Sequence, residues 1–310
     1  MILEIDESIL GNLEQEFFSQ YSRSSSEDTP VIFLLGASRT GSTFLYQAMI
    51  HRFRFTYFSN LANDAFPVHP IVAVALQHQL CSTIEASFKN RYGKTDGQLQ
   101  PSEASYVHQN WFAGNHPAQI RSKQVLPDRK EHFVQTISAA HHLTGHPLII
   151  KNAWNCFRIE NLASLFPNAF FIWIRRDLKR SAISDLATRY KLRADPTVWN
   201  SATPANYEAL QREPYWVQVV ENQYEFNLAV SDGLTSFAAG RYYDLWYEDL
   251  CKDPEAELEK MQEQLAVRTQ RDVRLDVYDS QTTLDQSDKE KIESYISKHS
   301  ERLGSHLYTG

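Results

Sequence analysis

The sequence is short of the residues that mark fibrous, disordered and disulfide-linked proteins. Glycine and proline contribute only 11 and 12 of its 310 residues, too few for a collagen-like or low-complexity chain. Its three cysteines, Cys81, Cys156 and Cys251, have no CxxC spacing, so neither a zinc site nor a disulfide framework is expected. No apolar run approaches the roughly 18 residues of a membrane span. We therefore expect a soluble protein of a reducing compartment.

An excess of positive charge is also lacking. Lys and Arg total 31 against 38 Asp and Glu, which gives a net charge of -7. This balance argues against nucleic acid or an anionic membrane as the main partner, so any anion site has to be a local basic cluster. The first ten residues, MILEIDESIL, lack the basic segment and apolar core of a secretory signal. The expected location is therefore the cytoplasm.

The chain does contain enough apolar residues, 42%, for a full core, and they alternate between two patterns. Short apolar runs at 31–35, 147–151, 169–174 and 241–247 predict strands, and helical patterns lie between them. Strands that alternate with helices predict an α/β fold with three layers, in which helices flank a central, mostly parallel sheet. Ligands of such sheets bind at the carboxyl ends of the strands.

The pattern shows neither an internal repeat nor a linker, so we expect a single domain over 1–310. An N-terminal helix and a Ser-rich connector would occupy 1–30, the core 31–260 and a helical segment 261–310. Residues 90–101 read as a loop long enough to serve as a lid or binding loop. The main helices are expected at 42–51, 70–88, 128–144, 157–166, 177–190 and 214–238, with another after Pro254.

A phosphate-loop pattern follows the first strand. Residues 36–43, GASRTGST, have the G-x-x-x-x-G frame between a strand and a helix, where backbone amides can cradle an anion. The lysine that a nucleotide triphosphatase has after the second glycine is Ser42 here, and the loop's one cation is Arg39. This argues against a bound triphosphate with magnesium. A glycine turn after a strand also occurs without any ligand, so the loop alone leaves the function open.

A second basic cluster follows the strand at 169–174, and Ser184 comes eight positions after Arg176. A run of cations is usually a solvated helix face. Here, however, the run stands at the carboxyl end of a buried strand in an acidic protein, which favours an anion site. The cluster consists of Arg175, Arg176, Lys179 and Arg180.

Together these motifs resemble bacterial sulfotransferases that use 3′-phosphoadenosine 5′-phosphosulfate (PAPS) and are related to the tyrosylprotein and carbohydrate sulfotransferases. GASRTGSTFL is similar to their 5′-phosphosulfate loop, and FIWIRRDLKRSAISDL is similar to the motif whose arginine and later serine hold the 3′-phosphate. A strand-end lysine, a Phe-Pro turn and the segment LWYEDL extend the resemblance from about residue 31 to 260. It implies PAPS as co-substrate, no metal, and transfer to a hydroxyl or amine of a small molecule, glycan or lipid.

The resemblance also implies roles for individual residues. Lys151 matches the family lysine that faces the sulfate and stabilises the leaving oxygen, although a strand-end lysine also reaches solvent in many proteins. Arg39 would serve both binding and catalysis. Tyr247 matches a tyrosine near the nucleotide, and simple strand packing is an equal interpretation. The residues expected to bind the donor are Ser38, Arg39, Thr40, Gly41, Ser42, Thr43, Arg176, Ser184 and Tyr247.

The general base is where this sequence departs from the family pattern. Relatives place a glutamate about twenty residues after the loop arginine, where this chain has Ser59 and Asn60. We rank Glu103 first, because its PSE segment resembles an acidic motif of the bacterial relatives, followed by Asp64 and His108. An alternative role for Glu103 is that of a first-turn helix residue.

Two other functions remain open at this level. One is a P-loop kinase or nucleotide hydrolase, against which Ser42 weighs. The other is a non-catalytic nucleotide-binding protein. The sequence names neither the acceptor nor the oligomeric state.

Overall fold

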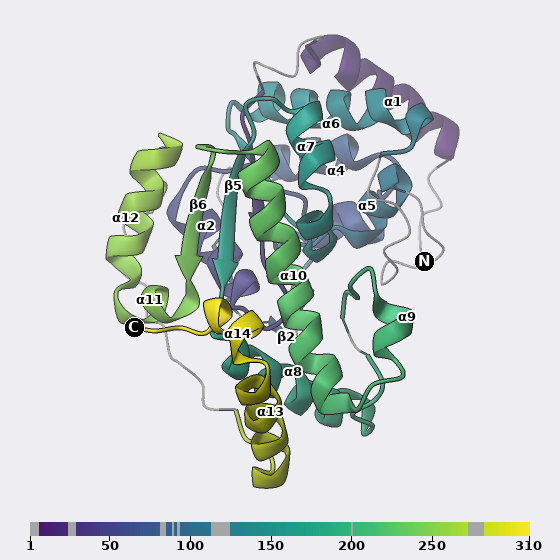
Figure 1. Cartoon of the computed structure of the whole chain (residues 1–310). Coiled ribbons are helices and arrows are strands. Elements are labelled where there is room, and N and C mark those ends of the chain that lie inside the picture. Colours follow the sequence, from purple (N-terminus) through teal and green to yellow (C-terminus); the bar gives the residue numbers. More distant parts are fainter. Residues whose placement is uncertain are drawn as a thin grey trace.

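A computed structural model describes residues 6–23, 29–80, 85–88, 90–91, 94–112, 125–199, 201–271 and 282–310. At its centre lies a parallel sheet in the order β4-β1-β5-β6 (Figure 1). The expected α/β class and all four expected strands are confirmed, each strand within one residue of its expected bounds. They are β1 (Val31–Leu35), β4 (Leu148–Lys151), β5 (Phe170–Arg175) and β6 (Tyr242–Trp246).

The central strand shows why the apolar runs form a sheet. β1 pairs with β4 on one side and β5 on the other, and all five of its residues are buried. Phe33 faces one apolar cluster and Ile32 the other, because successive side chains of a strand point to opposite faces. A strand covered on both faces needs no polar side, so its sequence is continuously apolar.

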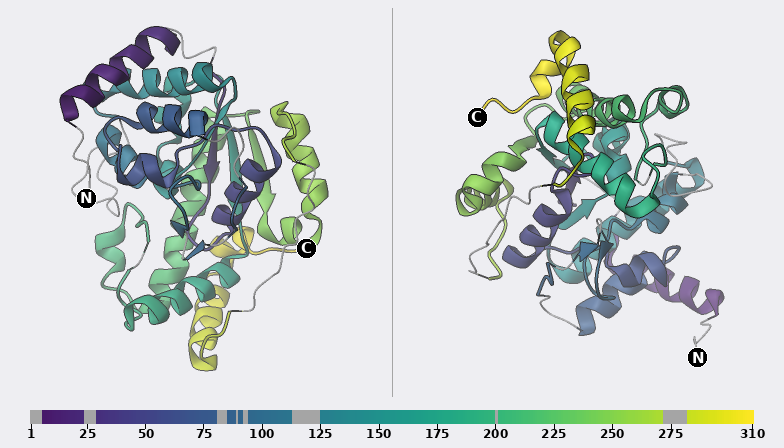
Figure 2. Two further views of the ribbon diagram at one scale, coloured as in Figure 1. Left: turned by 180° about the vertical axis from the view of Figure 1, so that it is seen from behind. Right: turned by 90° about the horizontal axis from the view of Figure 1, so that it is seen from below.

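Helices cover both faces of this sheet, which gives the three expected layers (Figures 1 and 2). One face packs against α2 (Ser42–Arg52) and α12 (Pro254–Leu265). The opposite face packs against α6 (Lys130–Thr144), α7 (Ile159–Leu165) and α10 (Tyr215–Phe237).

The C-terminal helices form a third apolar cluster beside the sheet. α13 (Gln286–Lys298) and α14 (Ser300–Leu303) pack with α8 (Leu178–Arg193) and α10. The chain then continues past α14 to the strand ends, where its terminus lies near α11 (Tyr247–Lys252) (Figure 1).

Two expectations need correction. The segment 90–101 is not only loop, because it contains the antiparallel pair β2 (Asn90–Arg91) and β3 (Lys94–Thr95). The helix expected over 70–88 ends earlier, as α4 (Pro70–Leu80), and residues 85–88 are not helical. The remaining elements are α1 (Glu7–Tyr21), α3 (Asn60–Asp64), α5 (Ser105–Phe112), α9 (Tyr207–Leu210) and three short 3₁₀ turns at Pro127–Arg129, Ala153–Phe157 and Gly304–His306.

Cys156 and Cys251 carry free thiols, while Cys81 lies outside the described residues. Within the ranges given above, no helix has the length and apolar character needed to cross a membrane. The same ranges contain no group of three or more His, Cys, Asp or Glu side chains placed to hold a metal ion.

Candidate active site

The loop at 36–43 connects β1 to α2, and its first glycine is required by close packing. A Cβ on Gly36 would lie 2.8 Å from the Ile174 carbonyl oxygen on β5 and 2.9 Å from the Thr40 hydroxyl. The Gly36 amide also donates to the buried Cys156 thiol, 3.3 Å away. Neighbouring groups therefore fix the start of the loop from two sides of the sheet.

The second glycine of the loop is required by its conformation. Gly41 has φ +86°, in the left-handed region, and a Cβ there would lie 2.3 Å from the Tyr247 ring. Gly41 is also the N-cap of α2, and no side chain in the described part of the chain caps that helix. The amides of its first turn are thus left for another acceptor, as in an anion-binding helix N-terminus.

The second motif meets the loop directly. Arg39 Nε donates to the Ser184 hydroxyl on α8 at 3.1 Å, and Arg176 donates to the Arg39 carbonyl oxygen at 3.3 Å. The Arg176 guanidinium carbon lies 4.8 Å from the centre of the Tyr247 ring, so this ring packs between Arg176 and Gly41. The structure therefore brings together donor-binding candidates that are up to 208 positions apart in the sequence.

Lys151 lies at the carboxyl end of β4, on the other side of the same loop. Its side chain is buried, and Nζ donates to the Thr43 hydroxyl at 3.1 Å. It also forms an ion pair with Glu103. The neighbouring Asn152 donates to the Glu103 carbonyl oxygen at 2.9 Å, which holds the backbone of this acidic residue beside the strand end.

The segment that carries Glu103 pairs with residues about twenty positions after Arg39, where the resemblance implies a glutamate. Ser59 pairs with Pro101 in an antiparallel bridge, and the Ser102 amide donates to the Phe58 carbonyl oxygen at 2.9 Å. The segment that carries Glu103 therefore runs alongside residues 58–60. Ser59 has no carboxylate, and Glu103 on the paired segment supplies one nearby. Glu103 precedes α5 and is not part of its first turn.

The other two base candidates have different surroundings. Asp64 is exposed at the end of α3 and accepts a hydrogen bond from the Asn63 amide at 2.7 Å. His108 is buried within the core, with Nδ1 2.9 Å from the Ala104 carbonyl oxygen. Burial, followed by the nearby Arg158, lowers the pKa of His108 to about 3. Its imidazole is therefore neutral.

Several residues that support the site were not anticipated from the sequence. Gln223 on α10, fully buried, donates to the Ser38 carbonyl oxygen at 3.0 Å. Glu248 follows Tyr247 and accepts from the Asp177 amide at 3.2 Å, and burial raises the pKa of Glu248. Glu248 belongs to the LWYEDL segment and could have been singled out there. Gln223 lies in an ordinary helical pattern and has no comparable sequence signal.

The site therefore combines uncapped helix amides with Arg39, Arg176 and Lys151, and places one carboxylate against the lysine. Such a set can hold an anionic group, stabilise a departing oxygen anion and accept a proton. A family model described as "Sulfotransferase family" matches residues 30–271 of the chain. This protein belongs to the sulfotransferase family.

The structural comparison finds further sulfotransferases at low sequence identity. STF9 from Mycobacterium avium is 13% identical, with a TM-score of 0.49 over 94% of this chain and 72% of that one. STF1 from Mycobacterium tuberculosis H37Rv is 11% identical, with a TM-score of 0.49 over 94% of this chain and 81% of that one. A sulfotransferase from Alicyclobacillus acidocaldarius is 13% identical, with a TM-score of 0.47 over 89% and 94%. A comparison with curated protein sequences finds no significant match.

Family membership confirms the resemblance drawn from the loop and the second basic motif, and it makes this protein a transferase. The individual roles of the site residues in this sulfotransferase stay predictions.

Proposed function

We propose that this sulfotransferase moves a sulfuryl group from PAPS to a hydroxyl or amine of its acceptor by in-line displacement. The observation that carries the proposal is the convergence of two groups of side chains on one loop. Arg39, Arg176 and Ser184 meet at one end of it, and Lys151 with Glu103 meets Thr43 at the other. The 3′-phosphate of the donor would therefore bind at one end of the loop, and sulfuryl and proton transfer would occur at the other.

In this proposal the loop amides and Arg39 hold the 5′-phosphosulfate of the donor, and Arg176 with Ser184 holds its 3′-phosphate. Guanidinium groups suit phosphate because they donate two parallel, charge-assisted hydrogen bonds. Tyr247 supports this arrangement, since its ring contacts both Gly41 and Arg176. Ser184 is the hydroxyl that Arg39 already contacts, so the two motifs share one binding surface.

Transfer requires one bond to break and one to form. The bond between sulfur and the bridging phosphate oxygen breaks, the acceptor oxygen or nitrogen bonds to sulfur, and the acceptor proton moves to a base. Lys151 is placed to stabilise the charge on the departing phosphate oxygen, an interaction made mainly in the transition state. Glu103 is our proposed base because it touches Lys151 and because its segment pairs with Ser59 through Pro101. No step of this scheme needs a metal ion.

Calorimetric titration with 3′-phosphoadenosine 5′-phosphate, compared with ATP plus magnesium, tests the donor. We expect the bisphosphate to bind more tightly than ATP, and much more tightly than the same nucleotide without its 3′-phosphate. A preference for ATP with magnesium would support the kinase or hydrolase alternative and overturn the proposal.

The reaction itself is tested by incubation with labelled PAPS and a cell extract, followed by mass spectrometry for an added sulfonate. We expect this turnover to survive excess EDTA, because the loop lacks the lysine of a triphosphate site. Loss of turnover in EDTA that magnesium restores would contradict a metal-free transfer. Bisphosphate binding without any sulfated product would favour the non-catalytic alternative.

A further inference from the structure

A second cavity lies at the amino ends of the strands, at the opposite end of the sheet from the loop. It has a volume of about 490 Å³, within the usual range of small-molecule sites. Its walls come from the start of β1, the turn before β4, the start of β5 and residues 264–268 at the end of α12. The proposed sulfuryl transfer makes no use of this cavity.

Three groups that are or can become cationic line this cavity: Arg54, Arg268 and His146. No carboxylate does so among the described lining residues, although the whole protein carries a net charge of -7. Both arginines are exposed, and neither guanidinium has a hydrogen-bond or ion-pair partner within the described ranges. Among the described residues, no carboxylate therefore pairs with the positive charge of this cavity.

The backbone holds these cations together. The Arg54 amide donates to the Arg268 carbonyl oxygen at 3.0 Å, and the Thr56 amide donates to the Pro147 carbonyl oxygen, next to His146, at 2.9 Å. The segments that carry Arg54, Arg268 and His146 are thus tied to one another without any ligand. Burial lowers the pKa of His146, and Arg54 is the next largest cause. The field of the arginines therefore reaches the imidazole.

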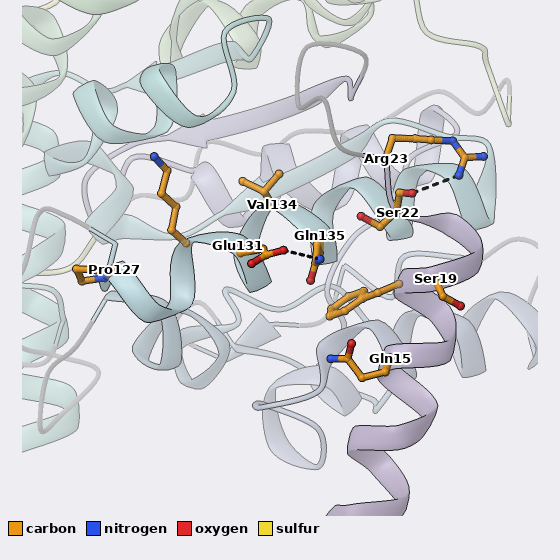
Figure 3. A pocket seen from close by; sticks show the side chains of 10 residues that line it. Gln15, Ser19, Ser22, Arg23, Pro127, Glu131, Val134 and Gln135 are labelled. Atoms are coloured by element: carbon orange, nitrogen blue, oxygen red, sulfur yellow. Dashed lines mark hydrogen bonds between the residues drawn. The ribbon is translucent and has the colours of Figure 1, made fainter.

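The charges that line this cavity differ from those that line another cavity of the protein. A groove of about 700 Å³ lies between α1 and α6, and both signs of charge line it (Figure 3). Among its charged groups, Glu131 accepts from Gln135 at 3.1 Å, and Arg23 donates to the Ser22 carbonyl oxygen at 3.2 Å. Because charges of both signs line it, the groove between α1 and α6 indicates no class of ligand. The charged groups of the cavity at the strand amino ends are of one sign, and its two arginines have no partner among the described residues.

The apolar side of the cavity restricts the ligand further. Phe170, Leu265 and Val267 form part of its wall, so a bound anion would also contact hydrocarbon. We propose that this cavity binds a phosphomonoester with an aromatic or aliphatic body, independently of the donor site. Arg54 and Arg268 bind the phosphate, and the apolar wall accepts the body of the molecule.

Titration with phenyl phosphate, followed through the imidazole proton resonances of His146 by NMR, tests this proposal. The His146→Gln variant assigns the resonances. We expect saturable shifts with phenyl phosphate, weaker binding of inorganic phosphate, which lacks the ring, and no shift with phenol, which lacks the charge. Phenyl phosphate that leaves the His146 resonances unmoved, or phenol that shifts them equally, would overturn the proposal.

Two double variants test whether phenyl phosphate binding depends on the arginines of this cavity or on positive charge anywhere on the surface. Arg54→Gln combined with Arg268→Gln should weaken phenyl phosphate binding about tenfold or more, because charge-assisted contacts are lost. Arg193→Gln combined with Arg212→Gln removes the same charge from exposed positions elsewhere and should leave the affinity unchanged, as should Arg176→Ala at the donor site. Equal weakening by both double variants would show a bulk charge effect and contradict a specific site. Thermal melting checks that each variant is folded.

Discussion

The two ends of the sheet both carry cations, but they hold them differently. At the carboxyl ends, Arg39 of the loop contacts Ser184 on α8, Arg176 and Lys151 contact loop groups, and the Lys151 side chain is buried. At the amino ends, Arg54 and Arg268 are exposed and have no partner in the part of the chain that the structure describes. A reaction requires catalytic side chains that are held in a fixed position. Exposed cations attract an anion but position it only weakly.

Helix direction strengthens this contrast. α2 begins directly after the loop, so the positive end of its dipole faces the site at the strand carboxyl ends. α6 ends at Thr144, and Gly145 after it lines the cavity at the amino ends, so the negative end of that helix points there. An anion in this cavity is therefore attracted by the arginines and opposed by a helix. We accordingly expect weaker anion binding at the amino ends than at the carboxyl ends.

The largest effect should come from the carboxylate at the carboxyl ends. Glu103→Gln removes the proposed base while it keeps the size of the side chain, and kcat should fall by roughly 10² to 10⁴. Steady-state kinetics with PAPS and an identified acceptor measure this loss. Donor affinity should change little, because Glu103 contacts Lys151 and not the arginines of the donor site.

Asp64→Asn is the matched test, because it makes the same chemical change at an exposed carboxylate. It should leave kcat nearly unchanged. If Asp64→Asn collapses while Glu103→Gln turns over normally, the base lies on α3 and our assignment is wrong.

The sequence predicted the α/β class and the four strands, because each depends on a local pattern of apolar residues. It also placed two basic motifs after strands, at the edge where parallel sheets bind ligands. Glu103 was ranked first among the candidate bases only because its PSE segment resembles an acidic motif of the bacterial relatives. The contact between Glu103 and Lys151 depends on the pairing of Ser59 with Pro101, which joins residues 42 positions apart. The spacing of apolar residues along the chain carries no information on such long-range pairing. Neither the contact between Glu103 and Lys151 nor the hydrogen bond from Gln223 to Ser38 could therefore be predicted from the sequence.

Gly41 at the carboxyl ends and Gly145 at the amino ends should differ in how much an alanine substitution destabilises the protein. Gly41→Ala should lower the free energy of unfolding by about 2 to 4 kcal/mol and weaken donor binding, because φ is positive there and the new Cβ would overlap the Tyr247 ring. Gly145→Ala also places alanine at a positive φ, +72°, but nothing lies within 4 Å of its Cβ. It should cost only about 1 kcal/mol.

Thermal and urea unfolding of both variants measure these costs. Equal losses at the two glycines would mean that backbone strain alone matters. The close packing of Tyr247 on the loop would then contribute nothing to stability.

A smaller effect is expected for the arginine and serine of the second motif. Arg176→Ala and Ser184→Ala should each weaken binding of 3′-phosphoadenosine 5′-phosphate roughly tenfold to a hundredfold, since a hydrogen bond to a charged group contributes about 1.5 to 3 kcal/mol. Lys179→Ala on the same helix is the control. Its ammonium is half exposed and pairs with Glu293 at 3.5 Å, so its loss should change affinity little. If calorimetry shows that Lys179→Ala weakens binding as much as Arg176→Ala and Ser184→Ala do, the basic cluster attracts the ligand by its overall charge and does not form a defined phosphate site.

The smallest predicted effect lies at the amino ends and concerns the titration of His146. Burial and the positive charges of Arg54, His78 and Arg268 lower the pKa of His146, because both disfavour the protonated imidazole. Arg54→Gln combined with Arg268→Gln should therefore raise this pKa part of the way toward the ordinary value of about 6.5, with burial and His78 accounting for the remainder. NMR titration of the imidazole measures the change, and Arg176→Ala at the opposite end of the sheet should leave the pKa where it is in the unaltered protein. If the double variant also titrates like the unaltered protein, the two arginines do not lower the pKa of His146 and do not generate a positive field in this cavity.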